Sequence, residues 1–521
     1  MKAIMRRTLA LMGVLIACTA ALPVAAQDIS NTSVPLDENQ LFGGDKDIVQ
    51  VIDTDVASKS VIELVADTKT YPVFLVEGSG SVGMVGSIYP LGAGAGDDAT
   101  VEGSVRLNNF LLTFLPNAAT TFNLSASGTL QSSGDQEFEA GLTTDVRASE
   151  FSRFYASGNF NYTYDAGTDA TVSGFAVEEI FIDTAIDRKV FFRMGKQRIS
   201  WGVGTWYQPA DVLSLAAIDL DNPTASREGP FAFKVDIPFG LNHATTYVTP
   251  PTAEDDIHVS LAQRIDIIVG GFELSLGGFV RSDLEAKPRL MVMLTGTLGD
   301  FDLYGENVAA WGSDRTYVRA KSGGGYETYE IEGVPVIQST IGAKYSWSNS
   351  DGLSLSAHLQ GYYNGTGYVD SAVLFIPGAL TTLKASSSYA KSDIEQTGMF
   401  YLAGNGSLSL DFGEDDTRST VTLGGSARYN FSDTSLSATP SLGLDLGSSR
   451  DFSLTLSAAA SIGEKGSEYA KTGNKVTPKI TVKALGDLTA SVSVPILMGV
   501  DFEPDKIDVD FSLLWNVLSF D

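Results

Sequence analysis

The feature that most constrains the fold is an alternation of apolar and polar residues that recurs in many segments from residue 70 to the C-terminus. In one such segment Val421, Leu423 and Ala427 alternate with Thr422 and Ser426. Successive side chains of a β-strand point to opposite faces, so each segment has one apolar face and one face of small polar residues. The alternation therefore predicts a protein built from amphipathic strands.

The length and spacing of these segments predict that the strands cross a membrane. Many exceed the ~5–6 residues of an ordinary strand, and about 9–11 tilted residues span a bilayer. Short turn sequences such as Gly299-Asp300 separate them, which favours antiparallel neighbours. Hydrocarbon cannot satisfy an open sheet edge, so membrane-spanning strands must close. We expect an all-β fold, a single antiparallel transmembrane β-barrel of about 20 strands, within a range of roughly 18–22.

The alternative is a soluble all-β solenoid or sandwich array, but the chain has no repeat of fixed length. The alternation also continues almost to the last residue, with Leu513 and Trp515 on one face and Ser512 on the other. This segment resembles the outer-membrane assembly signal, in which an aromatic residue ends the final amphipathic strand. Phe520 departs from that pattern because it is out of register with the apolar face, and Asp521 follows it. We expect an integral protein of the cell outer membrane.

Composition agrees with a barrel and narrows the set of partners. Charged residues make up 19% of the chain, below the quarter or so of an ordinary soluble protein. No apolar run of about 18 residues follows residue 26, which argues against a helical membrane protein. A net charge of −28 disfavours nucleic acid and favours cations near the molecule. The expected partners are outer-membrane lipid, the barrel assembly machinery and small solutes, with the oligomeric state left open.

The N-terminal part is predicted to lie outside the barrel wall. Residues 1–26 combine a basic start, an apolar stretch and small residues before Gln27, which is the pattern of a secretory signal peptide. Cys18 follows a sequence that also suits lipid attachment, so it is either removed with the leader or lipidated. Residues 27–69 are acidic and weakly patterned, and they predict a periplasmic tail or a plug. The barrel is expected to occupy 70–521.

Three long connections interrupt the strand pattern, at about 201–228, 312–335 and 365–396. Outer-membrane barrels have short periplasmic turns and longer external loops, and a long loop can fold inward and narrow the pore. The third connection contains the apolar run Ala372–Pro377. Two interpretations stay open for this run: packing within the loop, or contact with an apolar ligand in the lumen.

A motif at the start of the first connection supplies the candidate site. Residues 195–202 read GKQRISWG, and residues 208–211 read QPAD. This motif resembles a strand and loop of several outer-membrane barrels, including porins of the alginate-export type. The resemblance covers about 20 residues and implies a porin or substrate channel. Two sets of residues are singled out: Arg193, Gln197 and Asp211, with Asp219 and Asp221, as candidates for the pore entrance, and Trp201 and Trp206 as interfacial or loop anchors.

Further charged residues lie in alternating strand segments, where they can line the lumen and set an internal field. These candidate pore-lining residues are Asp145, Arg147, Lys234, Asp236, Arg264 and Asp266.

No pattern of a catalytic or metal centre is present. The three histidines (His243, His258 and His358) are scattered without metal-ligand spacing, and no nucleophile motif accompanies them. We expect no enzyme activity, no cofactor and no metal site. The favoured function is a porin for diffusion of small polar solutes and ions, weakly cation-preferring because of the acidic excess. The alternatives are a hatch-gated transporter of apolar molecules and a structural or adhesive surface barrel.

Overall fold

The computed structural model describes residues 72–91, 100–215, 218–225, 227–250, 258–283, 286–413, 418–447, 452–484, 488–499 and 502–520. The expected signal peptide and the acidic segment 27–69 lie outside the described residues. Within them the chain forms 23 strands of one antiparallel sheet. No helix in this part of the chain is long and apolar enough to cross a membrane.

The elements follow in chain order. The strands are β1 (Val73–Leu91), β2 (Thr100–Asn117), β3 (Thr120–Gln131), β4 (Gln136–Ser149), β5 (Ser152–Asp165), β6 (Ala170–Ile186), β7 (Val190–Lys196), β8 (Phe231–Phe239), β9 (Asn242–Thr249), β10 (Ser260–Val269), β11 (Phe272–Arg281), β12 (Arg289–Leu298), β13 (Phe301–Ala320), β14 (Tyr326–Ser348), β15 (Leu353–Asn364), β16 (Phe400–Phe412), β17 (Ser419–Asn430), β18 (Ser435–Leu446), β19 (Phe452–Ile462), β20 (Asn474–Ala484), β21 (Leu488–Ser493), β22 (Ile496–Met498) and β23 (Pro504–Phe520). Between β15 and β16 lie the short helices η1 (Ser371–Phe375), α5 (Pro377–Lys384) and η2 (Lys391–Ile394).

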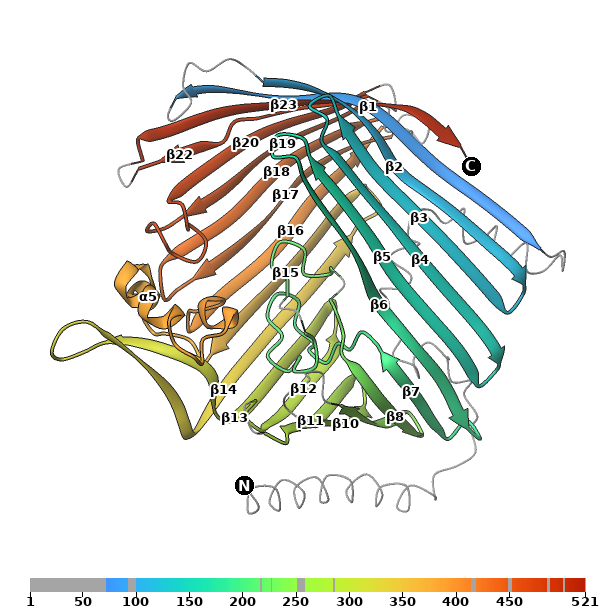
Figure 1. Cartoon of the computed structure of the whole chain (residues 1–521), viewed down its shortest axis with the longest axis vertical. Coiled ribbons are helices and arrows are strands. Elements are labelled where there is room, and N and C mark those ends of the chain that lie inside the picture. Colours follow the sequence, from blue (N-terminus) through green and yellow to red (C-terminus); the bar gives the residue numbers. More distant parts are fainter. Residues whose placement is uncertain are drawn as a thin grey trace.

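The sheet closes on itself because the last strand pairs with the first (Figure 1). Gly78 of β1 lies opposite Phe520 of β23, and the other strands pair with their neighbours in sequence. β21 and β22 both lie between β20 and β23, so the 23 strands fill 22 positions of the wall. The expected single antiparallel barrel of about 20 strands is confirmed.

The two faces of the wall differ as the alternation predicted. On β17 the side chain of Leu423 is 58% exposed on the outer face. Its neighbour Thr422 lies on the inner face, where its hydroxyl hydrogen-bonds to that of Ser409 at 3.0 Å. Large apolar side chains such as Leu290 and Ile341 are likewise exposed on the outside, as contact with lipid requires. The chain is an integral outer-membrane β-barrel.

The wall is not equally tall around the barrel. Strands β7–β12 have 7–10 residues, whereas β13 has 20 and β14 has 23. The predicted connection at 312–335 was therefore wrong: the strand pair shifts register around Gly312 and continues as a hairpin that curves away from the barrel (Figure 1). The alternation failed there because both faces have the same surroundings: residues 316–318 are buried in succession against the 365–399 connection, whereas 319–325 are exposed in succession.

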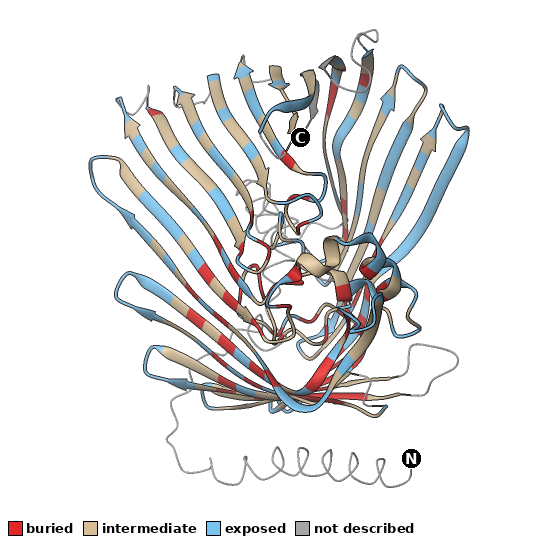
Figure 2. Cartoon of the chain, turned by 90° about the vertical axis from the view of Figure 1, so that its left-hand side faces the viewer, coloured by how far each residue is buried: buried red, intermediate tan, exposed pale blue. Residues whose placement is uncertain are grey.

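The two ends of the barrel carry different connections. At the end where β1 begins and β23 ends, the turns are short, such as 240–241 between β8 and β9. At the opposite end lie the longer connections 197–230 and 365–399. Short turns are periplasmic in such barrels, so the long connections belong to the external end. We call the short strands β7–β12 the low part of the wall. Figure 2 shows that buried residues gather in this part and in the segments inside the barrel.

Candidate functional site

The connection between β7 and β8 turns into the barrel; we call its residues 197–230 the inner loop, and all except 216, 217 and 226 are described. The turn begins at Gly195, which has a φ of 139°. A Cβ atom added at this position would lie 2.0 Å from Ile180 O, so only glycine fits. Gln197 is 1% exposed, and its side-chain amide donates to Ala232 O at 2.9 Å. The backbone N–H of Arg198 donates to Glu179 Oε1 at 2.9 Å. These contacts direct the chain away from the wall.

Trp201 is the first anchor of the inner loop. Its side chain is 2% exposed and packs edge-on against Tyr247, with ring centroids 5.8 Å apart. The Arg264 guanidinium lies 5.9 Å from the same ring. The surrounding cluster joins loop residues to inner-face residues of β8–β13: Ile199, Ala210 and Leu213 with Ala232, Ala262, Phe279, Met291, Met293 and Val308. Trp201 is thus a loop anchor within the lumen rather than a residue of the membrane interface.

Gln360 of β15 provides the second anchor, on another part of the wall. It is fully buried, and its Oε1 accepts hydrogen bonds from the backbone N–H groups of Thr205 and Trp206, both at 2.9 Å. Its Nε2 donates to Tyr207 O at 2.8 Å. One side chain therefore satisfies three backbone groups that a buried loop would otherwise leave unpaired.

Aromatic stacking strengthens the second anchor. The Trp206 ring lies 4.5 Å from the His358 ring, and the Tyr207 ring stacks on Tyr362 at 4.8 Å. The Tyr207 hydroxyl is 3.1 Å from that of Tyr469 in the connection between β19 and β20, and burial raises the pKa of Tyr207. The inner loop consequently spans from β7 and β8 to β15 and β16. His358 therefore lies on the inner face of the wall.

A close approach fixes the middle of the inner loop. Glu306 of β13 is fully buried beneath Gly204. A Cβ added at Gly204 would lie 3.0 Å from Glu306 Oε1 and 2.0 Å from Tyr207 O, so no larger residue fits. The backbone of the inner loop thus rests directly on the wall.

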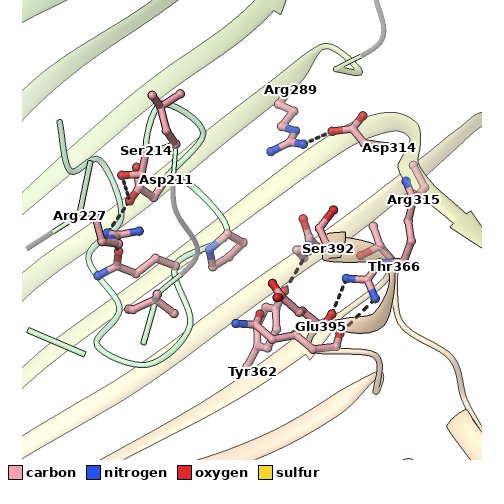
Figure 3. Close-up of a pocket in the computed structure, with 17 residues that line it drawn as sticks. Asp211, Ser214, Arg227, Arg289, Asp314, Arg315, Tyr362, Thr366, Ser392 and Glu395 are labelled. Carbon is pink, nitrogen blue, oxygen red and sulfur yellow. Dashed lines mark hydrogen bonds and ion pairs between the residues drawn. The ribbon is translucent and has the colours of Figure 1, made fainter. Parts of the chain in front are cut away.

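A polar pocket of about 370 Å³ lies between the inner loop, the β12–β13 wall and the 365–399 connection (Figure 3). Arg227 pairs with Asp211 at 2.5 Å and donates to Gln208 at 2.6 Å. Arg289 of β12 pairs with Asp314 of β13 at one side of the pocket (Figure 3). Most lining residues come from distant parts of the chain, and the motif supplies only Gln208, Pro209 and the candidate residue Asp211.

Arg315 contributes a third guanidinium to the polar pocket. It donates to the backbone carbonyls of Glu395 at 3.0 Å and Gln396 at 3.4 Å (Figure 3). Its partners are neutral carbonyls, so its positive charge is less compensated than that of Arg227 or Arg289. The pocket can therefore offer guanidinium, carboxylate and amide groups to a polar solute.

The predicted charged residues lie mostly in ion pairs on the inner face of β4–β10. Asp183 and Arg153, which were not singled out from the sequence, complete two of the pairs from neighbouring strands. The pairs are Arg153 with Asp145 at 2.9 Å, Arg193 with Asp183 at 2.7 Å, Lys234 with Asp236 at 3.4 Å and Arg264 with Asp266 at 3.0 Å. Arg147 is exposed near the end of β4, opposite Arg153 in register. Pairing reduces the internal field that these residues were expected to set.

A second, more apolar pocket of about 550 Å³ lies beside the polar one. Its walls include Leu374 and Phe375 of the apolar run in the 365–399 connection, and Leu374 also packs within the cluster around Leu383. Glu468 lines the same pocket and accepts a hydrogen bond from the Tyr401 hydroxyl at 2.7 Å. Burial raises the pKa of Glu468 to about 7. Both interpretations of the apolar run thus retain support.

No known protein family and no curated protein matches the sequence. Among solved structures, the siderophore receptor PirA from Acinetobacter baumannii is similar at 12% identity and a TM-score of 0.42, covering 87% of this chain and 81% of that one. Wzi, a carbohydrate-binding β-barrel of Escherichia coli involved in capsule assembly, has 10% identity, a TM-score of 0.36 and coverages of 88% and 86%. OccK11 from Pseudomonas aeruginosa has 9% identity, a TM-score of 0.30 and coverages of 86% and 96%. Such distant likeness carries no information about what this chain transports or binds.

Proposed function

We propose that the protein is a channel for passive diffusion of small polar solutes and ions, narrowed by the inner loop. The supporting observation is that this loop is anchored across one part of the lumen, while β16–β20 retain an inner face of mainly Ser and Thr, with lysines on β20. Those small polar side chains suit a water-filled passage. The polar pocket beside the loop lies at the narrowed part and is the proposed contact site for solutes.

A weak cation preference remains part of the proposal. Glu137 and Glu139 flank the outward-facing Phe138 on β4, so both lie on the inner face, and both are exposed. On β20 the exposed Lys479 and Lys483 share the inner face with Thr481. Lysines thus offset part of the acidic excess, and the expected selectivity is modest.

The ends of the inner loop lie together, which allows a direct test. The N–H of Gln197 donates to Pro230 O at 3.1 Å, so a short Gly-Ser linker can replace 199–228 without stretching the wall. Single-channel conductance of the refolded chain should rise several-fold in planar bilayers. Shortening the hairpin tip at 321–325 is the matched control and should leave conductance unchanged. Equal conductance of the loop-replaced and native barrels would contradict a channel narrowed by this loop.

The apolar pocket supports a second candidate, a hatch-gated transporter of apolar molecules. Its apolar walls at Leu220, Leu374, Phe375 and Leu380 adjoin the polar groups Arg428 and Glu468. This candidate predicts that a fluorescent amphipathic probe binds saturably and that Leu380→Asp abolishes the binding. It also predicts that deletion of 28–69 raises conductance. Absence of both effects leaves the diffusion channel as the better explanation.

A further inference from the structure

Three neighbouring strands bring a histidine and two carboxylates together inside the low part of the wall. His243 of β9 lies opposite Asp266 of β10 in register, and Asp266 lies opposite Ser275 of β11. Glu273 is two residues before Ser275 and therefore shares its face. One ligand atom from each of His243, Asp266 and Glu273 lies within 4.8 Å of the others. The sequence spacing gave no sign of this group, because strand register creates it.

Two buried carboxylate oxygens beside this group are unsatisfied. Asp266 is 1% exposed; its Oδ2 is 2.6 Å from His243 Nε2 and 3.0 Å from Arg264 Nε, but its Oδ1 accepts no hydrogen bond. Asp236 is 2% exposed, and its Oδ1, also without a hydrogen bond, lies 3.9 Å from His243 Nδ1. Buried carboxylate oxygens without a partner are costly, so each calls for an explanation.

We propose that His243, Asp266 and Glu273 bind a divalent transition-metal ion such as Zn²⁺. Imidazole nitrogen and carboxylate oxygen are both ligands of Zn²⁺, and three protein ligands leave one position for water. The free Oδ1 of Asp266 faces the metal while Oδ2 keeps Arg264. His243 Nε2 turns from Asp266 to the metal, and its Nδ1–H then faces Asp236, because metal-bound histidines commonly donate to an outer carboxylate. Both unsatisfied oxygens thereby gain a partner.

The charges around the group set the expected strength of binding. Asp236, Asp266 and Glu273 supply three negative charges, and Lys234 and Arg264 supply two positive ones. The small negative excess favours a dication, while the nearby cations hold the affinity below that of a dedicated structural zinc site. The ligands come from β9, β10 and β11, so bound metal ties three strands of the low wall together. The proposal is independent of conduction through the barrel.

The test is titration of ZnCl₂ into the refolded, detergent-solubilised chain, followed by isothermal calorimetry at pH 7.5. One Zn²⁺ should bind per chain, and the melting temperature should rise with Zn²⁺ because the ion binds only the folded barrel. His243→Ala and Glu273→Gln should each weaken binding at least tenfold. Both side chains are partly exposed, so these variants are expected to fold, as judged by heat-modifiable gel migration.

His258→Ala is the matched control. His258 Nδ1 lies 3.7 Å from Asp283, and among the described residues no third ligand joins that pair. Its replacement should leave the Kd for Zn²⁺ unchanged. Co²⁺ provides a second readout: visible d–d bands should appear with the native chain and disappear with His243→Ala. Absence of saturable 1:1 binding, or equal affinity of the native chain and the His243 and Glu273 variants, overturns the proposal.

Discussion

Two parts of the wall, β7–β13 and β16–β20, have outer faces of the same kind. Their inner faces differ in the residues that they carry. In both, large apolar side chains such as Leu290 and Leu423 are exposed to lipid. Inside, β7–β13 bury Met291 and Met293 beneath the inner loop and carry several ion pairs. β16–β20 present mainly Ser, Thr and Gly, with hydroxyl pairs such as Ser409 and Thr422. The lipid determines the outer face everywhere, whereas the inner face depends on whether protein or solvent lies against it.

The largest effect is expected from removing the first anchor of the inner loop. Trp201→Ala leaves a cavity against β8–β13, which should cost about 3–5 kcal/mol of loop docking. The loop should then leave the wall for part of the time, and single-channel records should show larger and noisier conductance. Trp311→Ala is the control, because Trp311 is 62% exposed on the outer face. If Trp201→Ala and Trp311→Ala gave identical conductance records, the proposed difference between the loop-covered strands β7–β13 and the uncovered strands β16–β20 would be contradicted.

A smaller effect should follow from weakening the second anchor. Gln360→Ala removes the acceptor of the Thr205 and Trp206 amides and the donor to Tyr207, at a cost of about 2–4 kcal/mol. Hydrogen exchange of those two amides should accelerate by at least tenfold, while strand amides of β16–β20 remain protected. Unchanged hydrogen exchange at the Thr205 amide would mean that the stacking of Tyr207 on Tyr362 is sufficient to hold the inner loop in place.

The docking of the loops should also depend on pH through Glu468. Its pKa is raised to about 7 in the folded chain from an ordinary value of 4.5, because burial disfavours the carboxylate. The contribution of Glu468 to stability is therefore fully present below about pH 4.5 and is lost as the pH rises through about 7, a total change on the order of 3 kcal/mol. Thermal melts should show a lower melting temperature at pH 8 than at pH 5. Glu468→Gln should flatten this dependence; an equally steep profile in the variant would assign it to another group.

The smallest expected effect concerns ion selectivity at the exposed charges of β4 and β20. Replacing Glu137 and Glu139 by Gln should shift the reversal potential in a salt gradient by a few millivolts towards anions, since both acids are exposed on the inner face. Replacing Lys479 and Lys483 by Gln is the matched experiment and should shift it towards cations. If both double variants shifted the reversal potential in the same direction, or not at all, ions would not pass close to these charges on β4 and β20.

Features that follow from the alternation of apolar and polar residues could be predicted from the sequence. Contacts that depend on strand register or on residues far apart in the chain could not. The closed barrel and its lipid-facing residues followed from alternation, and the motif singled out Arg193 and Asp211 as candidates for the pore entrance. The partner of Arg193, Asp183, became visible only through the β6–β7 register. Gln360 lies more than 150 residues from the backbone groups that it binds. Such contacts leave no local signal in the chain.

The seam between β1 and β23 has a consequence for biogenesis. It joins residues separated by almost the whole described chain, such as Gly78 and Phe520, so it cannot form until Phe520 has joined the sheet. Until then the sheet is open, and the inner loop can move from solvent onto its growing concave side. Once the seam closes, the loop is enclosed by the completed cylinder.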